Sequence, residues 1–424
     1  MLKIKKGLNL PIAGKPSSEI DDTKTVRSVA ILGEDYPGMK PTMAVAVGDT
    51  VKRGQVLFSD KKTEGVVFTS PISGTVVEIN RGAKRAFIGL VIEAAGDAAE
   101  SFSSYDATQL GALERTAVIE QLRSSGAWTA LRTRPFSRIP SPQTEPNSIF
   151  VTAMDTNPLA ADPKPIIASK AAEFSAGLSV LSRLTDGPVH LCQDSSSVLD
   201  ASNHDGVTSH VFEGPHPAGL PGTHIHFVDP VSPNKTVWFI GYQDVIAIGH
   251  LFLHGSVLSE RVVALGGPGV SSPRLIKTCL GANLEELTAG ELEAGEQRVV
   301  SGSVLAGHTA QGHRAYLGRY HNQVSVLAEH RERKLLGYLA PGSSVHSVFP
   351  AFLSKWIGEK SVSFTTTTNG SERGMVPIGT YDDVIPMDIL ATPLMKSILV
   401  GDVEKSIELG CLELDEEDIA LCTY

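Results

Sequence analysis

The chain has 424 residues, of which 42% are hydrophobic and 20% are charged, and its formal net charge is −10. A single core rarely grows beyond roughly 250–300 residues, so this length predicts several domains. The negative charge argues against nucleic acid as a partner, because phosphate binding needs clustered Lys and Arg, and it argues equally against adsorption on anionic lipid.

The sequence contains no candidate transmembrane segment and no apolar signal peptide at its start. Its most apolar stretch, residues 237–258, is interrupted by Gln243, Asp244, His250 and His254. The four cysteines are widely spaced and form no C-x-x-C pair, which favours a reducing compartment and argues against an iron–sulfur cluster held by this chain alone. We therefore predict a cytoplasmic protein, which other subunits must hold if it works at a membrane.

Short strands separated by glycine turns are predicted in the first hundred residues. The segments VAVGDTVKRGQVLF (45–58) and TSPISGTVVEIN (69–80) place glycines at turns between β-branched runs. This spacing resembles the barrel-sandwich hybrid of lipoyl and biotinyl domains, and we assign residues 1–100 to such a module. Lys61 and Lys62 lie where those carriers bear their prosthetic group. A solvated turn is the favoured interpretation, and a lipoylated or biotinylated lysine is the alternative.

Strands alternating with helices are predicted for residues 101–258, which indicates a Rossmann-like α/β domain with helices on both faces of a parallel sheet. The segments SIFVTAM, PVHLC, HIHFV and VWFIG are predicted strands. Asp162 before Pro163 predicts a helix start, and apolar residues at spacings of three and four continue this helix to Leu184. Residues 244–253 predict a helix that is apolar nearly all round and therefore buried.

The last two parts of the chain are predicted to differ in character. Short strands around one small helix indicate a β-grasp-like domain, similar to SLBB domains, over residues 259–334. A C-terminal helical region follows over residues 335–424, with apolar helical stretches at 347–356 and 387–400 and an acidic run at 413–418. Apolar stretches beside a charged tail predict a docking surface completed by a partner more than a part of the core.

Several long segments, in the same order, resemble one protein family. They are KIKKGLNLPIAG, LGEDYPGMKPTM, DTNPLAADP, THIHFVDPVSP, GYQDVIAIG and MVPIGTYDDVIPMDIL. The pattern is similar to the A subunits of sodium-translocating NADH:quinone oxidoreductases (Na⁺-NQR), and more distantly to the C subunit of the Rnf complex and the flavoprotein subunit of complex I. The resemblance implies a complex that reduces ubiquinone to ubiquinol with electrons from NADH and exports Na⁺.

The resemblance also implies partners, cofactors and a location. We expect the chain to assemble with the B, C, D, E and F subunits on the cytoplasmic side of the bacterial inner membrane, and to contribute to quinone interaction or to assembly. NADH, flavins and iron–sulfur centres are expected on the partner subunits. For this chain itself we predict no catalytic residue, no metal and no bound redox cofactor.

The absence of a phosphate-cradling glycine loop supports that prediction. The flavoprotein relatives use such a loop so that backbone N–H groups approach the phosphates of FMN and NADH. The matching segment here is GAWTALRTRPFSRIP (126–140), whose bulky side chains would block this approach. The alternative function is a stand-alone FMN- and NADH-binding dehydrogenase with the complex I flavoprotein fold.

Two segments are candidate quinone sites, because a quinone ring needs flat apolar contacts and donors for its carbonyl oxygens. The alternative for the first is a surface turn whose Tyr packs locally, and for the second a core plug with ion pairs. The first segment contributes Glu34, Asp35, Tyr36, Gly38, Met39 and Lys40. The second contributes Trp128, Arg134, Phe136 and Arg138.

Histidines provide a third, weaker hypothesis. His224 and His226 are two residues apart on a predicted strand and would face one side of it. His204, His210 and His216 are close in sequence. Zinc would need a third and a fourth ligand in tetrahedral geometry, so structural histidines are the favoured interpretation.

Overall fold

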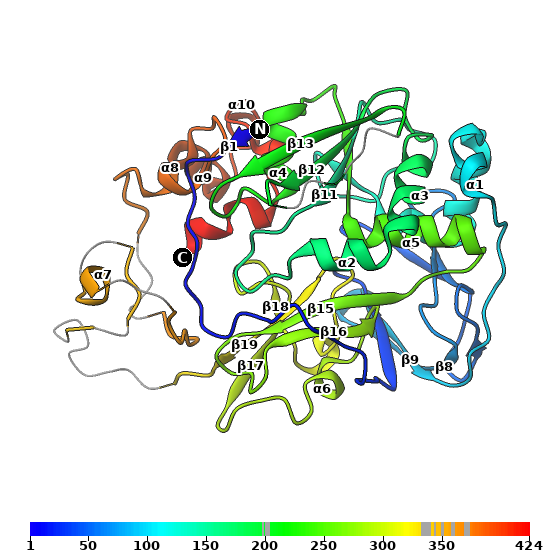
Figure 1. Ribbon diagram of the computed structural model, residues 1–424, viewed down its shortest axis with the longest axis horizontal. Coiled ribbons are helices and arrows are strands. Elements are labelled where there is room, and N and C mark those ends of the chain that lie inside the picture. Colours follow the sequence, from blue (N-terminus) through cyan, green and yellow to red (C-terminus); the bar gives the residue numbers. More distant parts are fainter. Residues whose placement is uncertain are drawn as a thin grey trace.

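The computed structural model describes residues 1–196, 199, 204–331, 341–342, 345–348, 352–357, 361–368 and 374–424 (Figure 1). These residues form three sheet-based modules and a C-terminal helical segment, which confirms the predicted α/β multidomain class. None of the described helices combines the length and apolarity that crossing a bilayer requires. The helix predicted at residues 347–356 lies partly outside the described residues, which include α7 (Ser354–Ile357).

The first module consists of two small antiparallel sheets, as expected for a barrel-sandwich hybrid. One sheet has the order β3 (Ser28–Leu32), β9 (Phe87–Ala94), β8 (Gly74–Arg81), β5 (Thr50–Val51). The other has the order β4 (Pro41–Met43), β6 (Val56–Asp60), β7 (Val67–Thr69). The module buries Leu57, Phe58 and Val76 between them. Lys61 and Lys62 are exposed in the turn between β6 and β7.

A six-stranded sheet forms the centre of the α/β domain. Its order is β1 (Leu2–Lys3), β13 (Val207–Glu213), β12 (Val189–Asp194), β11 (Ile149–Ala153), β14 (Val237–Gly241), β10 (Arg132–Arg134). All neighbouring pairs are parallel except β10 with β14, which is antiparallel. The predicted parallel sheet is therefore confirmed, with one antiparallel edge strand.

Helices cover both faces of this sheet because its strands are apolar on both sides. Along β11, Ile149 and Val151 belong to the large core that includes α3 (Ala171–Leu181) and α5 (Tyr242–His254). Phe150 between them faces the opposite side and packs in a second cluster with Ile225 of α4 (Pro221–Val228). Four short helical elements precede β10 in the chain: η1 (Ala83–Arg85), η2 (Ala107–Ala112), α1 (Arg115–Ser124) and η3 (Ala127–Ala130).

Two local predictions in this domain need correction. Asp162 caps α2 (Pro163–Ser169) as predicted, but the helix ends at Ser169, with the non-helical Lys170 as its C-cap, and α3 begins as a separate helix. The predicted strand HIHFV is helix α4 instead, which begins with Pro221 at its first position. A proline whose fixed φ suits the first helical turn outweighs the β propensity of a short apolar run.

The third module has a mixed six-stranded sheet, ordered β18 (His308–Thr309), β17 (Gln297–Ser301), β19 (Gln323–Ala328), β15 (Glu260–Gly266), β16 (Arg274–Cys279), β2 (Ile20–Asp21). The helix α6 (Leu284–Leu287) packs Leu284 and Leu287 against it. Parallel pairing of β15 with β19, flanked by antiparallel neighbours, is the predicted β-grasp-like arrangement.

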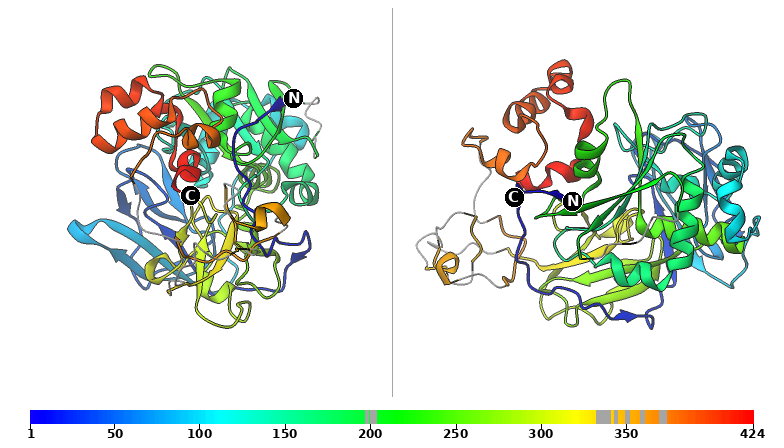
Figure 2. Two further views of the ribbon diagram at one scale, coloured as in Figure 1. Left: turned by 90° about the vertical axis from the view of Figure 1, so that its left-hand side faces the viewer. Right: turned by 45° about the horizontal axis from the view of Figure 1, so that its top comes forward.

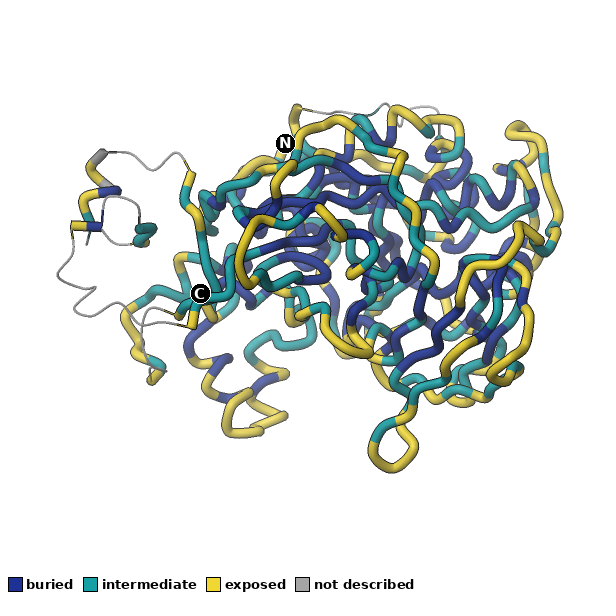
Figure 3. Tube along the Cα trace, turned by 90° about the horizontal axis from the view of Figure 1, so that it is seen from below, coloured by how far each residue is buried: buried dark blue, intermediate teal, exposed yellow. Residues whose placement is uncertain are grey.

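The N-terminal segment joins the modules to one another. Strand β1 extends the α/β sheet, and β2 extends the third sheet, before the chain enters the first module at β3. Arg274 fixes β2 by binding the Asp21 carboxylate at 2.7 Å. One continuous core then extends from Val29 in the first module through Ile248 of α5 to Leu275 in the third. Figure 3 shows this buried interior and the exposed loops around it.

The C-terminal segment contains α8 (Thr380–Val384), α9 (Ala391–Val400), α10 (Val403–Glu408), η6 (Cys411–Glu413) and η7 (Glu416–Thr423). Ile385, Met387, Ala391 and Met395 form its own small core. Figure 2 shows its last residues, in red, beside α4 and the sheet of the α/β domain. The acidic end of this segment therefore packs against the core. This differs from the prediction that residues 335–424 form a docking surface more than a part of the core.

Candidate functional site

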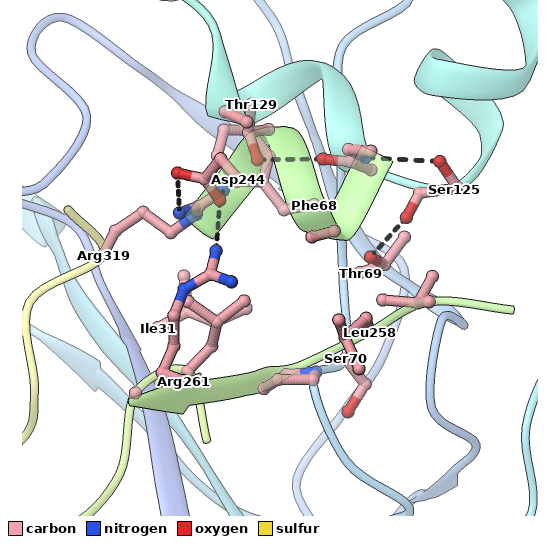
Figure 4. A pocket seen from close by; sticks show the side chains of 18 of the residues that line it. Ile31, Phe68, Thr69, Ser70, Ser125, Thr129, Asp244, Leu258, Arg261 and Arg319 are labelled. Carbon is pink, nitrogen blue, oxygen red and sulfur yellow. Dashed lines mark hydrogen bonds and ion pairs between the residues drawn. The ribbon is translucent and has the colours of Figure 1, made fainter. Parts of the chain in front are cut away.

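A cavity of about 80 Å³ lies where the three modules meet (Figure 4). The first module contributes β3, the loop after it and β7, and the third module contributes Arg261, Leu280, Gly281, Leu317 and Arg319. The α/β domain contributes η3 and one side of α5. Most of the wall is apolar, and the charged residues are gathered at one end.

The first turn of α5 positions the central acid of that charged end. Asp244 binds the Arg319 guanidinium through both oxygens, at 3.0 and 3.1 Å, and it also binds Arg261 (Figure 4). Gln243 fixes this turn by exchanging hydrogen bonds of 2.7 and 2.9 Å with the backbone of Val262. Burial alone would raise the pKa of Asp244, but the charges of both arginines lower it below its ordinary value. Asp244 is therefore a carboxylate at neutral pH.

Asp35 lies beside Arg319 and differs from Asp244 in its pKa. It accepts a hydrogen bond of 3.0 Å from the backbone N–H of Arg319. Burial raises the pKa of Asp35 to about 7, and the nearby carboxylate of Glu34 acts in the same direction. The cavity therefore has one acid with a lowered pKa and one with a pKa of about 7, and such perturbed pairs are found at functional sites.

Aromatic rings close the cavity next to Asp35. Tyr36 is buried and packs edge-on against Phe68, with 4.7 Å between ring centroids, and against Tyr320, at 6.2 Å. The Tyr320 hydroxyl donates to the carbonyl oxygen of Thr129 at 2.9 Å. The Arg132 guanidinium lies over the Tyr320 ring at 4.2 Å. These contacts join the first and third modules to η3 and fix the shape of the wall.

The structure brings the two predicted segments together at this cavity, but only two of the predicted residues line it, and both belong to the first segment. From the first segment, Asp35 and Tyr36 line it. Glu34 instead pairs with Arg314, the Lys40 backbone donates to Asp60 at 3.0 Å, and Met39 packs on the core. Gly38 and Arg138 adjoin each other outside the cavity, since a side chain added at Gly38 would lie 3.8 Å from the guanidinium.

From the second segment, the small residues line the cavity and the predicted large ones do not. Gly126, Ala127, Thr129 and Ala130 form the wall. Trp128 is fully buried, donates its Nε1–H to the Pro140 carbonyl at 2.9 Å, and packs edge-on against Trp238 at 5.5 Å. Phe136 is 66% exposed, and the Arg138 guanidinium lies 5.7 Å from its ring. Of the predicted aromatic and arginine residues, Trp128 therefore fills the core, and Phe136 and Arg138 form a surface turn.

Arg134 is fully buried and binds the acidic run at the end of the chain. Its Nη1 lies 3.0 Å from Asp418, which is also fully buried, and its Nη2 lies 3.4 Å from Glu417 and 3.6 Å from Asp415. Burial raises the pKa of Glu417 to about 7 and raises that of Asp418 as well. An ion pair with the C-terminal segment therefore occupies the region in which the resemblance places a phosphate loop.

The predicted histidine pair does not form a metal site. His224 and His226 are two residues apart on helix α4. Their side chains are therefore about 200° apart around the helix axis and point to nearly opposite sides of the helix. His224 is buried and bonds the Ala218 carbonyl at 3.0 Å, and burial lowers its pKa to about 3. His226 binds Glu413 at 2.7 Å. Each of the two histidines therefore bonds another part of this chain, and His226 is a second tie to the C-terminal segment.

Asp244, Arg261 and Arg319 are the residues that the sequence analysis missed. They come from a helix start, a strand and a loop, so their meeting depends on how the modules pack. The one local signal is that Asp244 interrupts an apolar run, since an acid inside a buried helix needs a partner.

Comparison with known proteins identifies the family. Family models for the NqrA N-terminal barrel-sandwich hybrid domain, the NqrA second alpha/beta domain and the NQRA C-terminal domain match residues 2–95, 113–257 and 262–312. The A subunit of the Na⁺-translocating NADH-quinone reductase from Saccharophagus degradans is 56% identical over 100% of this chain and 95% of its own length. This chain belongs to the family of these A subunits.

Other relatives agree with this membership. The proteins of the same name from Vibrio atlanticus and from Klebsiella pneumoniae strain 342 are each 56% identical, over 100% of this chain and 95% of theirs. The chain is thus one component of an enzyme complex and has partner subunits. A crystal structure of an NAD⁺-reducing NiFe hydrogenase in the H₂-reduced state aligns over 52% of this chain and 48% of its own, with a TM-score of 0.37 and 11% identity. That similarity is too low to group the two proteins.

Proposed function

We propose that this chain contributes to quinone interaction in the Na⁺-translocating NADH-quinone reductase complex, through the cavity where its three modules meet. The complex would take electrons from NADH, reduce ubiquinone to ubiquinol and export Na⁺. This chain would hold or guide the quinone headgroup without carrying flavin, nicotinamide or metal of its own in the electron path.

The observation that supports this proposal most is the convergence of both candidate segments on one cavity. The cavity offers the flat apolar walls that a quinone ring requires, formed by Tyr36, Phe68 and Ile248. The Arg319 and Arg261 guanidinium groups at its end are donors for a carbonyl oxygen. Asp35, with a pKa of about 7, donates a hydrogen bond when protonated and accepts one when ionised.

The proposal that the chain binds no redox cofactor is supported by the packing of residues 126–140. Trp128 and Arg134 fill this region with fully buried side chains. A phosphate approaching the same backbone would have to displace the Arg134–Asp418 ion pair, whose atoms lie 3.0 Å apart. The flavin-binding dehydrogenase is the second candidate function, and the visible spectrum of the purified chain separates the two.

We further propose that the B, C, D, E and F subunits hold this chain on the cytoplasmic side of the bacterial inner membrane. An apolar surface on α9 and α10 supports a protein interface there, because Leu399, Val400 and Val403 are 74%, 80% and 68% exposed. No other described helix of the chain covers these side chains, so a partner protein would bury them in the complex.

The quinone proposal is tested by binding of a short-chain ubiquinone, measured by calorimetry on the isolated chain and by photo-crosslinking of an azido-quinone in the complex. The variant Ala247→Phe places a ring in the cavity from α5 and is expected to weaken binding at least tenfold. Ala112→Phe, at an exposed position, is the matched control. Equal binding by both variants, or crosslinks confined to other subunits, would refute a quinone site in this chain.

A further inference from the structure

Helices α3 and α5 cross at very short range, at a place outside the cavity wall. A side-chain carbon at Gly249 would lie 1.7 Å from the Glu173 carbonyl oxygen, and one at Gly177 would lie 2.2 Å from the Val245 carbonyl. Only glycine permits this approach, and it brings the two backbones together in antiparallel order. The side chains next to this crossing are consequently held close to one another.

Three metal-binding side chains gather at this crossing. Their candidate ligand atoms, from Glu173 of α3 and from His250 and His254 of α5, all lie within 4.8 Å of one another. The two histidines are four residues apart on α5, so they face the same side of the helix. Their rings are in contact, with 4.5 Å between centroids. Two imidazoles and one carboxylate form a ligand set that zinc uses when it keeps an open position.

A second observation concerns a nitrogen of His250. Its Nδ1 is buried and has no hydrogen-bond partner among the described residues, whereas its Nε2 lies 3.3 Å from the Ser256 hydroxyl. If Nε2–H donates to that hydroxyl oxygen, the Nδ1 lone pair is left for a metal. A ring oriented through its other nitrogen is the usual arrangement for a ligating histidine.

We propose that Glu173, His250 and His254 form a binding site for a divalent transition metal, with Zn²⁺ as the favoured ion. Tetrahedral zinc with bonds of about 2.0–2.1 Å separates its ligand atoms by roughly 3.4 Å. The three groups therefore need to move by about one ångström on binding, and the exposed side chain of His254 is free to do so. Water completes the coordination.

Charged groups of both signs lie around His250 and limit the affinity of the site for a metal ion. Lys170 and Arg53 repel a dication, whereas Glu173 and the carbonyl end of α5 attract it. We therefore expect micromolar affinity.

The site adjoins the junction cavity but is distinct from it. Leu251 of α5 faces the cavity, and Val257 and Leu258 line it just after the helix ends. A metal held by His250 and His254 would fix the last turn of α5 and the Ser256 turn that leads to these two residues. Metal binding is thus expected to stabilise one wall of the cavity without entering it.

The test is a Zn²⁺ titration of the untagged, chelator-treated chain by calorimetry, with metal content measured after dialysis. We expect one Zn²⁺ per chain, and at least a tenfold loss of affinity in Glu173→Gln and in His254→Ala. His313→Ala, which removes an exposed histidine elsewhere, is the matched control and should bind like the parent. Substitution with Co²⁺ should give the visible absorption of a four-coordinate ion, and this band should disappear in both site variants.

Two outcomes would overturn the proposal. One is equal affinity in the parent and both site variants, which would place the bound zinc elsewhere. The other is the absence of stoichiometric binding by the parent at micromolar Zn²⁺. Thermal unfolding in chelator separates loss of a ligand from loss of the fold, because each variant should then melt like the parent, and only the parent should melt higher when Zn²⁺ is added.

Discussion

Asp418→Ala tests whether the acidic end of the chain is part of the fold. Asp418 and Arg134 are both fully buried, with 3.0 Å between their charged atoms. Removing one partner of a buried ion pair costs about 3–5 kcal/mol, because the other charge is left without compensation. Here Glu417 and Asp415 remain at 3.4 and 3.6 Å from Arg134, and both are partly solvent-exposed. We therefore expect a loss near the lower limit, about 3 kcal/mol.

This loss is large enough to measure in the isolated chain. Urea unfolding followed by tryptophan fluorescence is a suitable assay, because Trp128 and Trp238 pack against each other in the same domain. For a cooperative unit of 150–250 residues, about 3 kcal/mol corresponds to a lowering of the melting temperature by about 6–12 °C. Glu416→Ala removes an exposed acid from the same segment and should change stability by less than about 0.5 kcal/mol.

The double variant Arg134→Met with Asp418→Ala completes the test. If the loss arises from an unpaired buried charge, removing Arg134 as well should recover much of the stability. A single variant Asp418→Ala that unfolds like the parent would refute the reasoning. It would mean that the acidic run is detached in solution and that residues from about 335 onward are the dispensable docking region that the sequence predicted.

Three further predictions concern the site and the surface. Purified chain should bind neither FMN nor NADH at micromolar concentration in calorimetry, since each lost charge-assisted phosphate hydrogen bond costs about 1.5–3 kcal/mol; a stoichiometric site would refute this. Asp35 has a raised pKa of about 7, so the folded form holds a proton that the unfolded form releases, and the contribution of Asp35 to stability should be lost as pH rises from about 4 through 7. Asp35→Asn removes this contribution, so the difference in unfolding free energy between parent and variant should change across this pH range in urea unfolding, and a difference that is constant with pH would contradict it. Leu399→Glu should leave the melting temperature unchanged but abolish co-purification with the other subunits, whereas Lys396→Glu on the same helix should not; loss in both or in neither would exclude the α9–α10 interface.

The parts of the fold that were predictable are those set by local chemistry. Glycine turns between β-branched runs predicted the first module, and Asp162 before Pro163 predicted the start of α2. The strand assigned to residues around His224 was wrong because a short apolar run fits either structure, and Pro221 decides for a helix. The break at Lys170 carries no strong sequence signal, since the apolar spacing continues across it.

The cavity itself was not predictable in the same way, because no single segment contains it. Its charged end needs Asp244 from the start of α5, Arg261 from β15 and Arg319 from a loop of the third module. Arg261 is 17 positions from Asp244 in the sequence, and Arg319 is 75 positions from it, although both bond its carboxylate. A search for local motifs therefore selects conspicuous residues such as Trp128 and Arg134, whose bulk suits a packed interior, and passes over the small ones that leave room for a ligand.

The ties between modules have a consequence for how the cavity responds to change. The cavity lies at a junction, so its shape depends on contacts between modules. These are the pairing of β1 in the α/β sheet, the pairing of β2 in the third sheet, and the hydrogen bond from the Tyr320 hydroxyl to Thr129 of η3. Loosening any of these ties would let the modules shift, whereas a packed core resists gradual deformation. If the cavity binds quinone, a variant such as Tyr320→Phe, which removes the 2.9 Å hydrogen bond to Thr129, should weaken quinone binding while leaving every apolar wall residue in place. Unchanged quinone affinity in that variant would show that the wall is held by apolar packing alone.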